Sequence, residues 1–537
     1  MSSPLERTFE TLAKREDPKA TGLLMEAVGR DDGVGVTAAV SVGRHGPLSL
    51  KYEVLSRVDR LSPGQKQAIR THARCFADAA KHALDSRDES ERSLGVRWIA
   101  AVEDFERFPD LVGRLGRTQE SELPALTEAI DHLTNRMFDE VDGRTNGRGD
   151  AYALRNAREL RESMHRSLVD AVERIETQPC PGPLIEWSLI LADAEGAGVA
   201  RLINKIPATH REELIRTLRD GVHPGVMRLP LDLLKRAHPF DFVADLWRER
   251  DDEPFVHHVL RTFPDKLTDM QQKHAVGITS LPWLGGDPAS LEAIPPGYRA
   301  GLAKLVTRFG LPEAGKRQTL QWLLKEGDAE TRRIASAGFG LIDHEERVEI
   351  LQQGLEHEES EVRVWATRNL KTQAVPDATR LLIAKLDSED ESVREAARAE
   401  LSEFNLAAAA DMLDRNPAGV TPELGVLLKK IHPDLTLDLR KELANPIRGR
   451  RVAATRLASA LGMVEDVESG VVALCEDPDM LVRRTAVEAL RTVVTRDSIA
   501  AIRRALADSS GRVREAALES YQHVAGLARA AAEGVTA

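Results

Sequence analysis

One arrangement of apolar and charged positions recurs between about residues 331 and 521. An acidic residue is followed three positions later by a Val-Arg pair, then four positions after the valine by alanine, and four positions later by a large apolar residue. Residues spaced by four advance about 400° around an α-helix, so these apolar positions share one face. The clearest copies are Val362-Arg363 with Ala366 and Leu370, Val393-Arg394 with Ala397 and Leu401, Val482-Arg483 with Ala486 and Leu490, and Val513-Arg514 with Ala517 and Tyr521.

The clear copies are evenly spaced. Val362 and Val393 are 31 residues apart, and so are Val482 and Val513. A second apolar helix follows each copy, and a fixed period of this length predicts stacked helix hairpins, none of which buries its apolar face alone. Weaker copies are Thr331-Arg332 with Ala335 and Phe339, Gly449-Arg450 with Ala453 and Leu457, a worn copy near Thr421, and two early copies around Gly35 and Glu91.

The acidic residue of each copy stands where its helix is predicted to begin. A carboxylate in that place accepts hydrogen bonds from free backbone amides and is favoured by the helix dipole. Two copies lack it, since Pro446 and Ser510 occupy the position. The acidic residues in the other copies are Asp328, Glu359, Asp390 and Asp479.

This pattern resembles the HEAT repeat, particularly the short HEAT-like form found also in phycobilisome lyases. The resemblance covers about residues 327–525 and is patchy over 30–110. It implies an all-α fold, an α-solenoid of stacked antiparallel helix hairpins, with the Val-Arg helices in the inner, concave layer. It also implies that the repeated arginines bond acidic residues of neighbouring repeats in a ladder, namely Arg332, Arg363, Arg394, Arg450, Arg483 and Arg514.

Changes in composition suggest how the chain is organised. A Gly-, Asn- and Arg-rich stretch reads as a flexible loop, and a Pro- and Gly-rich stretch at 280–297 is the strongest break. We expect an N-terminal helical region with weak repeats at 1–141, the loop at 142–150, a divergent helical region at 151–297, the C-terminal solenoid at 298–530, and a frayed tail at 531–537.

Composition narrows the possible functions. The formal net charge of −12 argues against a general nucleic-acid or membrane-surface binder. Three cysteines, Cys75, Cys180 and Cys475, stand too far apart for a zinc ligand set, and they favour a reducing compartment. No run approaches ~20 apolar residues, so we expect a cytoplasmic protein with no membrane partner.

Several short motifs imitate catalytic or ligand sites. Gly33-x-Gly35-x-x-Ala38 follows a predicted helix, whereas a dinucleotide-binding turn follows a strand. Gly310–Lys316 resembles a phosphate-binding loop, but Arg317 replaces the Ser or Thr that would ligate magnesium. The pairs His344-Glu345 and His357-Glu358 contain residue types that can bind a metal ion. They fall at different points of their repeats, so they do not occupy matching positions in the stack. We therefore predict no catalytic residue, no metal site and no cofactor.

The segment 440–456 stands out by charge, with six basic residues against Glu442 alone. If it aligns with arginines of the next repeat, it forms a basic stripe that orients a charged partner; the alternative is ordinary solvated surface. The candidate partner-binding residues are Arg440, Lys441, Arg448, Arg450, Arg451, Arg456, Arg483 and Arg484.

These observations favour a non-enzymatic scaffold that binds a protein on the concave face of its C-terminal solenoid. Two alternatives stay open. One is a nucleic-acid binder that uses the basic stripe, as HEAT-like DNA glycosylases do. The other is a HEAT-like enzyme, either a lyase acting on a bilin or a metal hydroxylase. The sequence leaves the oligomeric state open.

Overall fold

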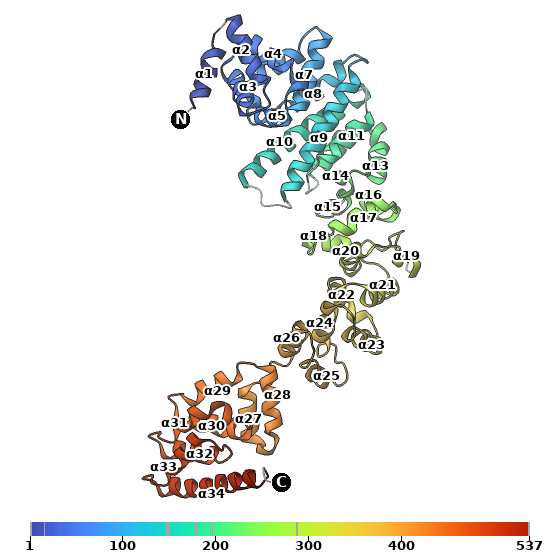
Figure 1. Cartoon of the computed structure of the whole chain (residues 1–537). Coiled ribbons are helices and arrows are strands. Elements are labelled where there is room, and N and C mark those ends of the chain that lie inside the picture. The colour runs from blue at the N-terminus through green and yellow to red at the C-terminus, as the bar shows by residue number, and fades with distance from the viewer. Residues whose placement is uncertain are drawn as a thin grey trace. The chain divides into compact units, whose positions relative to one another are not determined.

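The computed structural model of the chain describes residues 3–15, 17–145, 151–177, 181–193, 195, 197–285 and 288–534. Every regular element in these ranges is a helix, as predicted, and the helices stack as hairpins in an α-solenoid (Figure 1). Contacts divide the chain into two compact units, Met1–Trp322 and Leu323–Ala537, which we describe separately. No helix in the described ranges is long and apolar enough to cross a membrane.

The first unit consists of helices that pack mainly against their neighbours along the chain. Its α-helices are α1 Pro4–Ala13, α2 Pro18–Val28, α3 Gly33–His45, α4 Leu48–Leu55, α5 Pro63–Arg70, α6 Ala77–Leu84, α7 Glu89–Ala101, α8 Phe108–Arg114, α9 Leu123–Thr145, α10 Ala151–Val172, α11 Pro181–Ile190, α12 Ala197–Lys205, α13 Arg211–Asp220, α14 Pro224–Met227, α15 Leu229–Leu233, α16 Phe242–Glu249, α17 Glu253–Thr262, α18 Asp269–Ala275, α19 Pro288–Glu292 and α20 Pro296–Arg308. Its 3-10 helices are η1 Val58–Arg60, η2 Ala73–Phe76, η3 Phe105–Arg107, η4 Leu115–Arg117, η5 Ile175–Thr177 and η6 Ala208–His210.

The two early copies of the repeat both open helices of the first unit. Asp32 caps α3 and its carboxylate accepts hydrogen bonds from the amides of Val34 and Gly35. Gly35 is required because a Cβ there would lie 1.9 Å from the carbonyl oxygen of Arg30. The preceding element, α2, is a helix, so the glycine motif is a helix-packing feature.

Two expected boundaries differ from the structure. Helix α9 continues to Thr145, so the loop expected at 142–150 begins as helix, and residues 146–150 lie outside the described ranges. The expected division at 297/298 lies inside the first unit because α20 packs closely against α17. A Pro- and Gly-rich stretch can therefore turn the chain between two helices without ending a compact unit.

The second unit holds the clear repeats, preceded by α21 Glu313–Glu326, which spans the division between the units. Its α-helices are α22 Ala329–Ala335, α23 His344–Leu355, α24 Ser360–Asn369, α25 Ala378–Lys385, α26 Glu391–Glu400, α27 Leu406–Arg415, α28 Pro422–Ile431, α29 Leu435–Leu443, α30 Arg448–Ala460, α31 Glu468–Leu474, α32 Met480–Leu490, α33 Arg496–Ala505 and α34 Gly511–Gly534. Its 3-10 helices are η7 Ser336–Leu341, η8 Pro417–Gly419 and η9 Glu465–Val467.

The Val-Arg helices of this unit pack on one another in two series, α22 with α24 and α26, and α30 with α32 and α34. The valine and alanine positions of the clear copies are fully buried, as predicted. Trp365 is also buried, and its indole nitrogen donates to the Ser336 hydroxyl at 2.9 Å, so it packs between repeats. The expected tail at 531–537 begins within α34, and residues 535–537 lie outside the described ranges.

Candidate protein-binding surface

The repeated arginine has one characteristic set of contacts, seen clearly at Arg483. Its guanidinium donates to the carbonyl oxygens of Asp477 at 2.9 Å and Pro478 at 3.2 Å, in the turn before its own helix. It also pairs with the carboxylate of Asp508, in the next repeat, at 2.8 Å. We call this arrangement an arginine rung. It satisfies turn carbonyls and joins two repeats with a charge-assisted bond.

The same rung occurs elsewhere in the chain. Arg363 donates to the carbonyls of His357 and Glu358, each at 2.7 Å, and pairs with Asp390 of the next repeat at 2.9 Å. In the first unit, Arg92 pairs with Glu122 at 2.8 Å and donates to the carbonyls of Ser86 and Arg87. The ladder is therefore confirmed at Arg363 and Arg483, and Arg92 is a rung that we did not predict.

The prediction for Arg450 is wrong. Arg451 makes the rung instead: it donates to the carbonyls of Asn445 and Pro446, each at 2.9 Å, and pairs with Asp477 at 2.8 Å. The copy in α30 is thus displaced by one residue from the frame read in the sequence. The exposed Arg450 takes the place that a buried valine holds in the clear copies.

Three other predicted ladder arginines bond within their own repeat. Arg332 donates to the carbonyls of Gly327 and Lys325, and Arg514 donates to those of Asp508 and Ser509. Arg394 donates to carbonyls of its own turn and pairs with Glu391. These arginines still bond the helix to the turn before it, but none of their described ion pairs involves a residue of the next repeat.

The structure sorts the eight candidate binding residues into two groups. Arg451 and Arg483 have side chains only 14% exposed and serve as rungs. The other six, Arg440, Lys441, Arg448, Arg450, Arg456 and Arg484, are exposed. Arg448 lies 3.3 Å from Asp479, and Arg450 lies 3.2 Å from Glu442. Such exposed pairs contribute at most about 1 kcal/mol, so their charges can be exchanged for those of a partner.

The beginning of α30 also departs from the other Val-Arg helices. Asp479 caps α32 by accepting hydrogen bonds from the amides of Leu481 and Val482. The corresponding residue of α30 is Ile447, which forms no side-chain cap and is 60% exposed. Arginines also occupy the first turn of α30, where the helix dipole disfavours positive charge. The start of α30 therefore lacks the capping and dipole stabilisation of α32, and it carries exposed positive charge.

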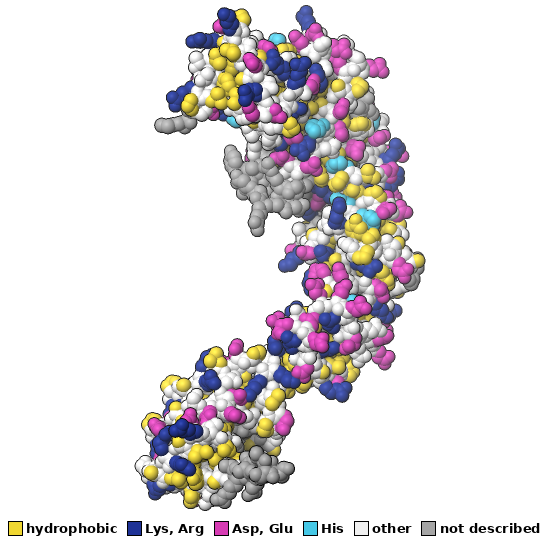
Figure 2. Space-filling model, viewed as in Figure 1, with side chains coloured by type: hydrophobic (Ala, Val, Ile, Leu, Met, Phe, Trp, Pro, Cys, Tyr) yellow, Lys and Arg dark blue, Asp and Glu magenta, His cyan; other side chains and the backbone are white. Residues whose placement is uncertain are grey.

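A groove of about 440 Å³ lies beside this helix end, between α27, α29 and α30. Its walls are mainly apolar, and four charged residues stand at its edge. In Figure 2, hydrophobic side chains reach the surface among Lys and Arg side chains over the end of the chain that holds these helices. The groove is lined by Leu406, Ala407, Ala410, Asp438, Lys441, Glu442, Arg450, Ala453, Ala454 and Leu457.

Two cavities of about 590 and 470 Å³ lie in the first unit. In the larger one, Arg70 pairs with Glu103 at 2.5 Å and with Glu140 at 2.6 Å. Burial raises the pKa of Asp104 there to about 6. In the smaller one, burial lowers the pKa of His165 to about 4. Among the described residues, no group of three or more His, Cys, Asp or Glu side chains is arranged to hold a metal ion.

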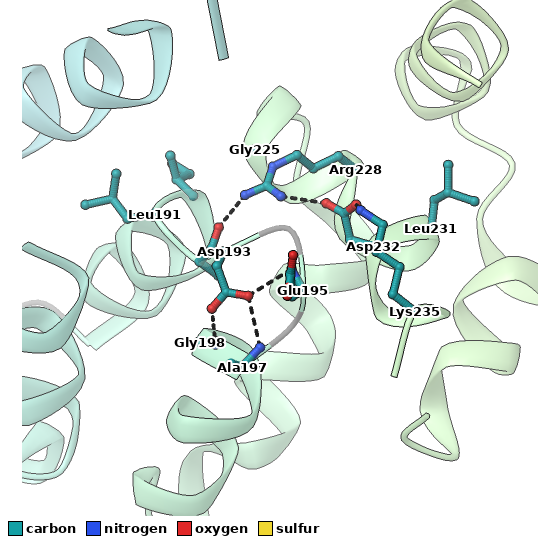
Figure 3. A network of polar contacts seen from close by, with 12 residues as sticks. Leu191, Asp193, Glu195, Ala197, Gly198, Gly225, Arg228, Leu231, Asp232 and Lys235 are labelled. Carbon is teal, nitrogen blue, oxygen red and sulfur yellow. Dashed lines mark hydrogen bonds and ion pairs between the residues drawn. The ribbon is translucent and has the colours of Figure 1, made fainter. Parts of the chain in front are cut away.

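The polar network beside the smaller cavity has a structural role (Figure 3). Burial alone would raise the pKa of Asp193, but hydrogen bonds from the amides of Gly198, Ala197 and Glu195 outweigh it and hold that pKa below its ordinary value. Arg228 donates to the carbonyl of Ala192 and pairs with Asp232 at 2.6 Å. These bonds join Asp193 to the start of α12 and Ala192 to Arg228.

Comparisons with known proteins agree with the repeat pattern. The family model described as HEAT repeats matches residues 316–402 and 437–522. A search of curated proteins gave no match. Matching solved structures include a Kap95:Nup1 complex, at 13% identity over 98% of this chain and 82% of that chain with a TM-score of 0.32.

Importin beta matches at 12% identity over 94% of this chain and 81% of that chain with a TM-score of 0.30. She4p matches at 12% identity over 97% of this chain and 71% of that chain with a TM-score of 0.25. The repeated helix hairpins, the arginine rungs and the family match together identify HEAT repeats in this chain over residues 316–402 and 437–522.

Proposed function

We propose that this protein is a non-enzymatic scaffold whose second unit binds an acidic segment of a partner protein at the exposed basic face of α29 and α30. One observation carries the proposal. The copy of the repeat in α30 replaces its acidic cap with Ile447 and its buried valine with the exposed Arg450. Departures from a local rule that bring no gain in stability are typical of functional sites.

The chemistry of this face supports an acidic partner. Segment 440–456 carries six basic residues and one acidic residue, although the whole chain has a net charge of −12. Arg448 and Arg450 each make one exposed ion pair, and carboxylates of a partner can replace these pairs at little cost. The stack of repeats offers an extended surface, and we place the binding face on its concave side.

The proposal is tested by reversing the exposed charges while leaving the rungs intact. The triple variant Arg448→Glu/Arg450→Glu/Arg456→Glu keeps Arg451 and Arg483, so we expect it to fold. Tagged wild type and variant are used to recover partners from extracts of the native cell, with quantitative mass spectrometry as the readout. We expect the yield of the principal partner to fall at least tenfold, because long-range attraction and local pairing are both removed.

A matched control separates this effect from net charge alone. Arg333→Glu/Arg368→Glu/Arg380→Glu reverses three exposed arginines on α22, α24 and α25 and should leave partner recovery unchanged. Equal recovery by the wild type and by the α30 variant would refute the proposed face. A partner that proves to be nucleic acid, lost from both variants in proportion to charge, would refute the assignment to protein.

A further inference from the structure

The direct packing of one Val-Arg helix on the next is interrupted between α26 and α30, where α27 and α28 intervene. In the other copies, the position three residues after the valine is buried, as at Trp365, Ala396 and Ala516. The corresponding residue of α30 is Ala453, which is exposed. The helix therefore presents to solvent a face that its counterparts bury.

The interruption follows from the packing of α27 and α28. Helix α28 packs against α26 and α29, and its Gly425 lies against the end of α30, where a Cβ would come 2.1 Å from the carbonyl oxygen of Leu461. Helix α27 takes the place beside α30 but does not cover all of it. The uncovered space is the groove of about 440 Å³.

The walls of the groove have helical spacing and small side chains. On α30 they are formed at positions 450, 453, 454 and 457, which is one face over two turns, or roughly 10 Å of helix. On α27 they are formed by Leu406, Ala407 and Ala410. Alanines on both sides leave room for the larger apolar side chains of another element.

The charges at the edge define the polar side of an occupant. Lys441 pairs with Asp438 at 2.8 Å, and Arg450 pairs with Glu442 at 3.2 Å. The wider segment 440–456 is strongly basic. An occupant with carboxylates next to an apolar stripe would meet both the apolar walls and these cations.

We propose that the groove receives an amphipathic α-helix of the partner protein, which covers the face of α30 that α27 and α28 leave exposed. The helix places apolar residues spaced i, i+3 or i+4, and i+7 against α27 and α30, and it turns acidic residues toward Lys441 and Arg450. This inference rests on the proposed function, because it specifies the form in which the acidic segment binds.

The test uses two labelled synthetic peptides of identical composition, rich in Leu, Ala and Glu. One has its leucines at helical spacing along one face, and the other has the same residues scrambled so that no apolar face forms. Fluorescence anisotropy with the full chain should show saturable binding of the amphipathic peptide and at least tenfold weaker binding of the scrambled one. Ala453→Trp, which fills the groove from an exposed position, should weaken amphipathic-peptide binding at least tenfold.

Further variants keep the outcome clear. Ala407→Trp fills the groove from its opposite wall and should have the same effect, whereas Ala399→Trp, at an exposed position of α26, should have none. Equal binding of both peptides, abolished only by the α30 charge reversal, would overturn the helix groove and leave the proposed acidic-segment binding standing. Absence of binding by either peptide, or self-association of the chain that Ala453→Trp abolishes, would also overturn this inference.

Discussion

Helices α30 and α32 are consecutive copies of one repeat, yet only α32 follows its rule throughout. Both bury small or apolar residues against their neighbours, and both carry a rung arginine, Arg451 in one and Arg483 in the other. They differ in the four residues before the rung: Ile-Arg-Gly-Arg from Ile447 in α30, and Asp-Met-Leu-Val from Asp479 in α32. The shared features, which are the rung arginine and the buried residues, hold the repeats together. The residues that open the two helices differ, so the repeat does not require one sequence there.

The largest expected effect is on the free energy of unfolding, which should fall more when a rung arginine is replaced than when an exposed arginine is replaced. Arg483→Ala leaves the carboxylate of Asp508, which is 10% exposed, without its ion pair, and removes the donor to two turn carbonyls. We expect a loss of about 2–3 kcal/mol in the free energy of unfolding. Arg450→Ala, at a side chain 60% exposed, should cost less than about 1 kcal/mol. Urea unfolding of both variants checks this, and equal costs would break the distinction.

A smaller effect on the free energy of unfolding is expected from the backbone conformation after α30 and after α24. Gly462, just after α30, adopts a left-handed backbone with φ of 65°, and Ala374, after α24, adopts φ of 51°. The Gly462 amide donates to the carbonyl of Ser459 in α30, and the Ala374 amide donates to that of Lys371 in the turn after α24. A left-handed residue in such a turn favours glycine. Gly462→Ala should destabilise the second unit by about 1 kcal/mol, and Ala374→Gly should stabilise it by about 0.5–1 kcal/mol. The same sign for both changes would contradict this account.

Part of this structure can be predicted from the sequence. It predicts the helix period, the buried valines and alanines, and most of the capping carboxylates, because local periodicity and capping determine them. It misplaces the frame in α30, since an arginine stands where the pattern requires valine. The sequence also gives no alignment for 151–297. Arginines there join distant helices without forming rungs: Arg161 and Arg250 donate to the carbonyls of Leu191 and Leu218, about 30 residues away.

The groove could not be predicted from the sequence at all. It depends on how α27 and α28 pack around a worn copy of the repeat, and no local residue pattern encodes that arrangement. The predicted basic residues were found by charge alone. Only the structure separates the rungs Arg451 and Arg483 from the six exposed side chains.

The smallest expected effect is a pH dependence of the free energy of unfolding that arises from the Arg483–Asp508 pair. The hydrogen bond from Arg483 holds the pKa of Asp508 below its ordinary value. Its stabilising contribution is therefore complete above a pH of about 4, the ordinary value, and is lost as pH falls through the lowered pKa. The advantage of wild type over Asp508→Asn in free energy of unfolding should shrink as pH falls from 5 to 2.

The variant Arg483→Ala supplies the control for this pH dependence. Without the guanidinium, the pKa of Asp508 should rise toward its ordinary value, so adding Asp508→Asn should change the pH profile less than it does in wild type. Urea titrations at several pH values measure both differences. A pH dependence of equal size in the two backgrounds would show that the rung is not its source.

The central claim is that α30 gives up local stability in order to bind a partner. Its most direct test grafts the first residues of α32 onto α30, as Ile447→Asp/Arg448→Met/Gly449→Leu/Arg450→Val, and measures partner recovery from native extracts beside urea unfolding. We predict a variant that is at least as stable as wild type, because the acidic cap is restored, and that recovers at least tenfold less partner. A stable grafted protein that recovers the partner as well as wild type does would contradict the claim.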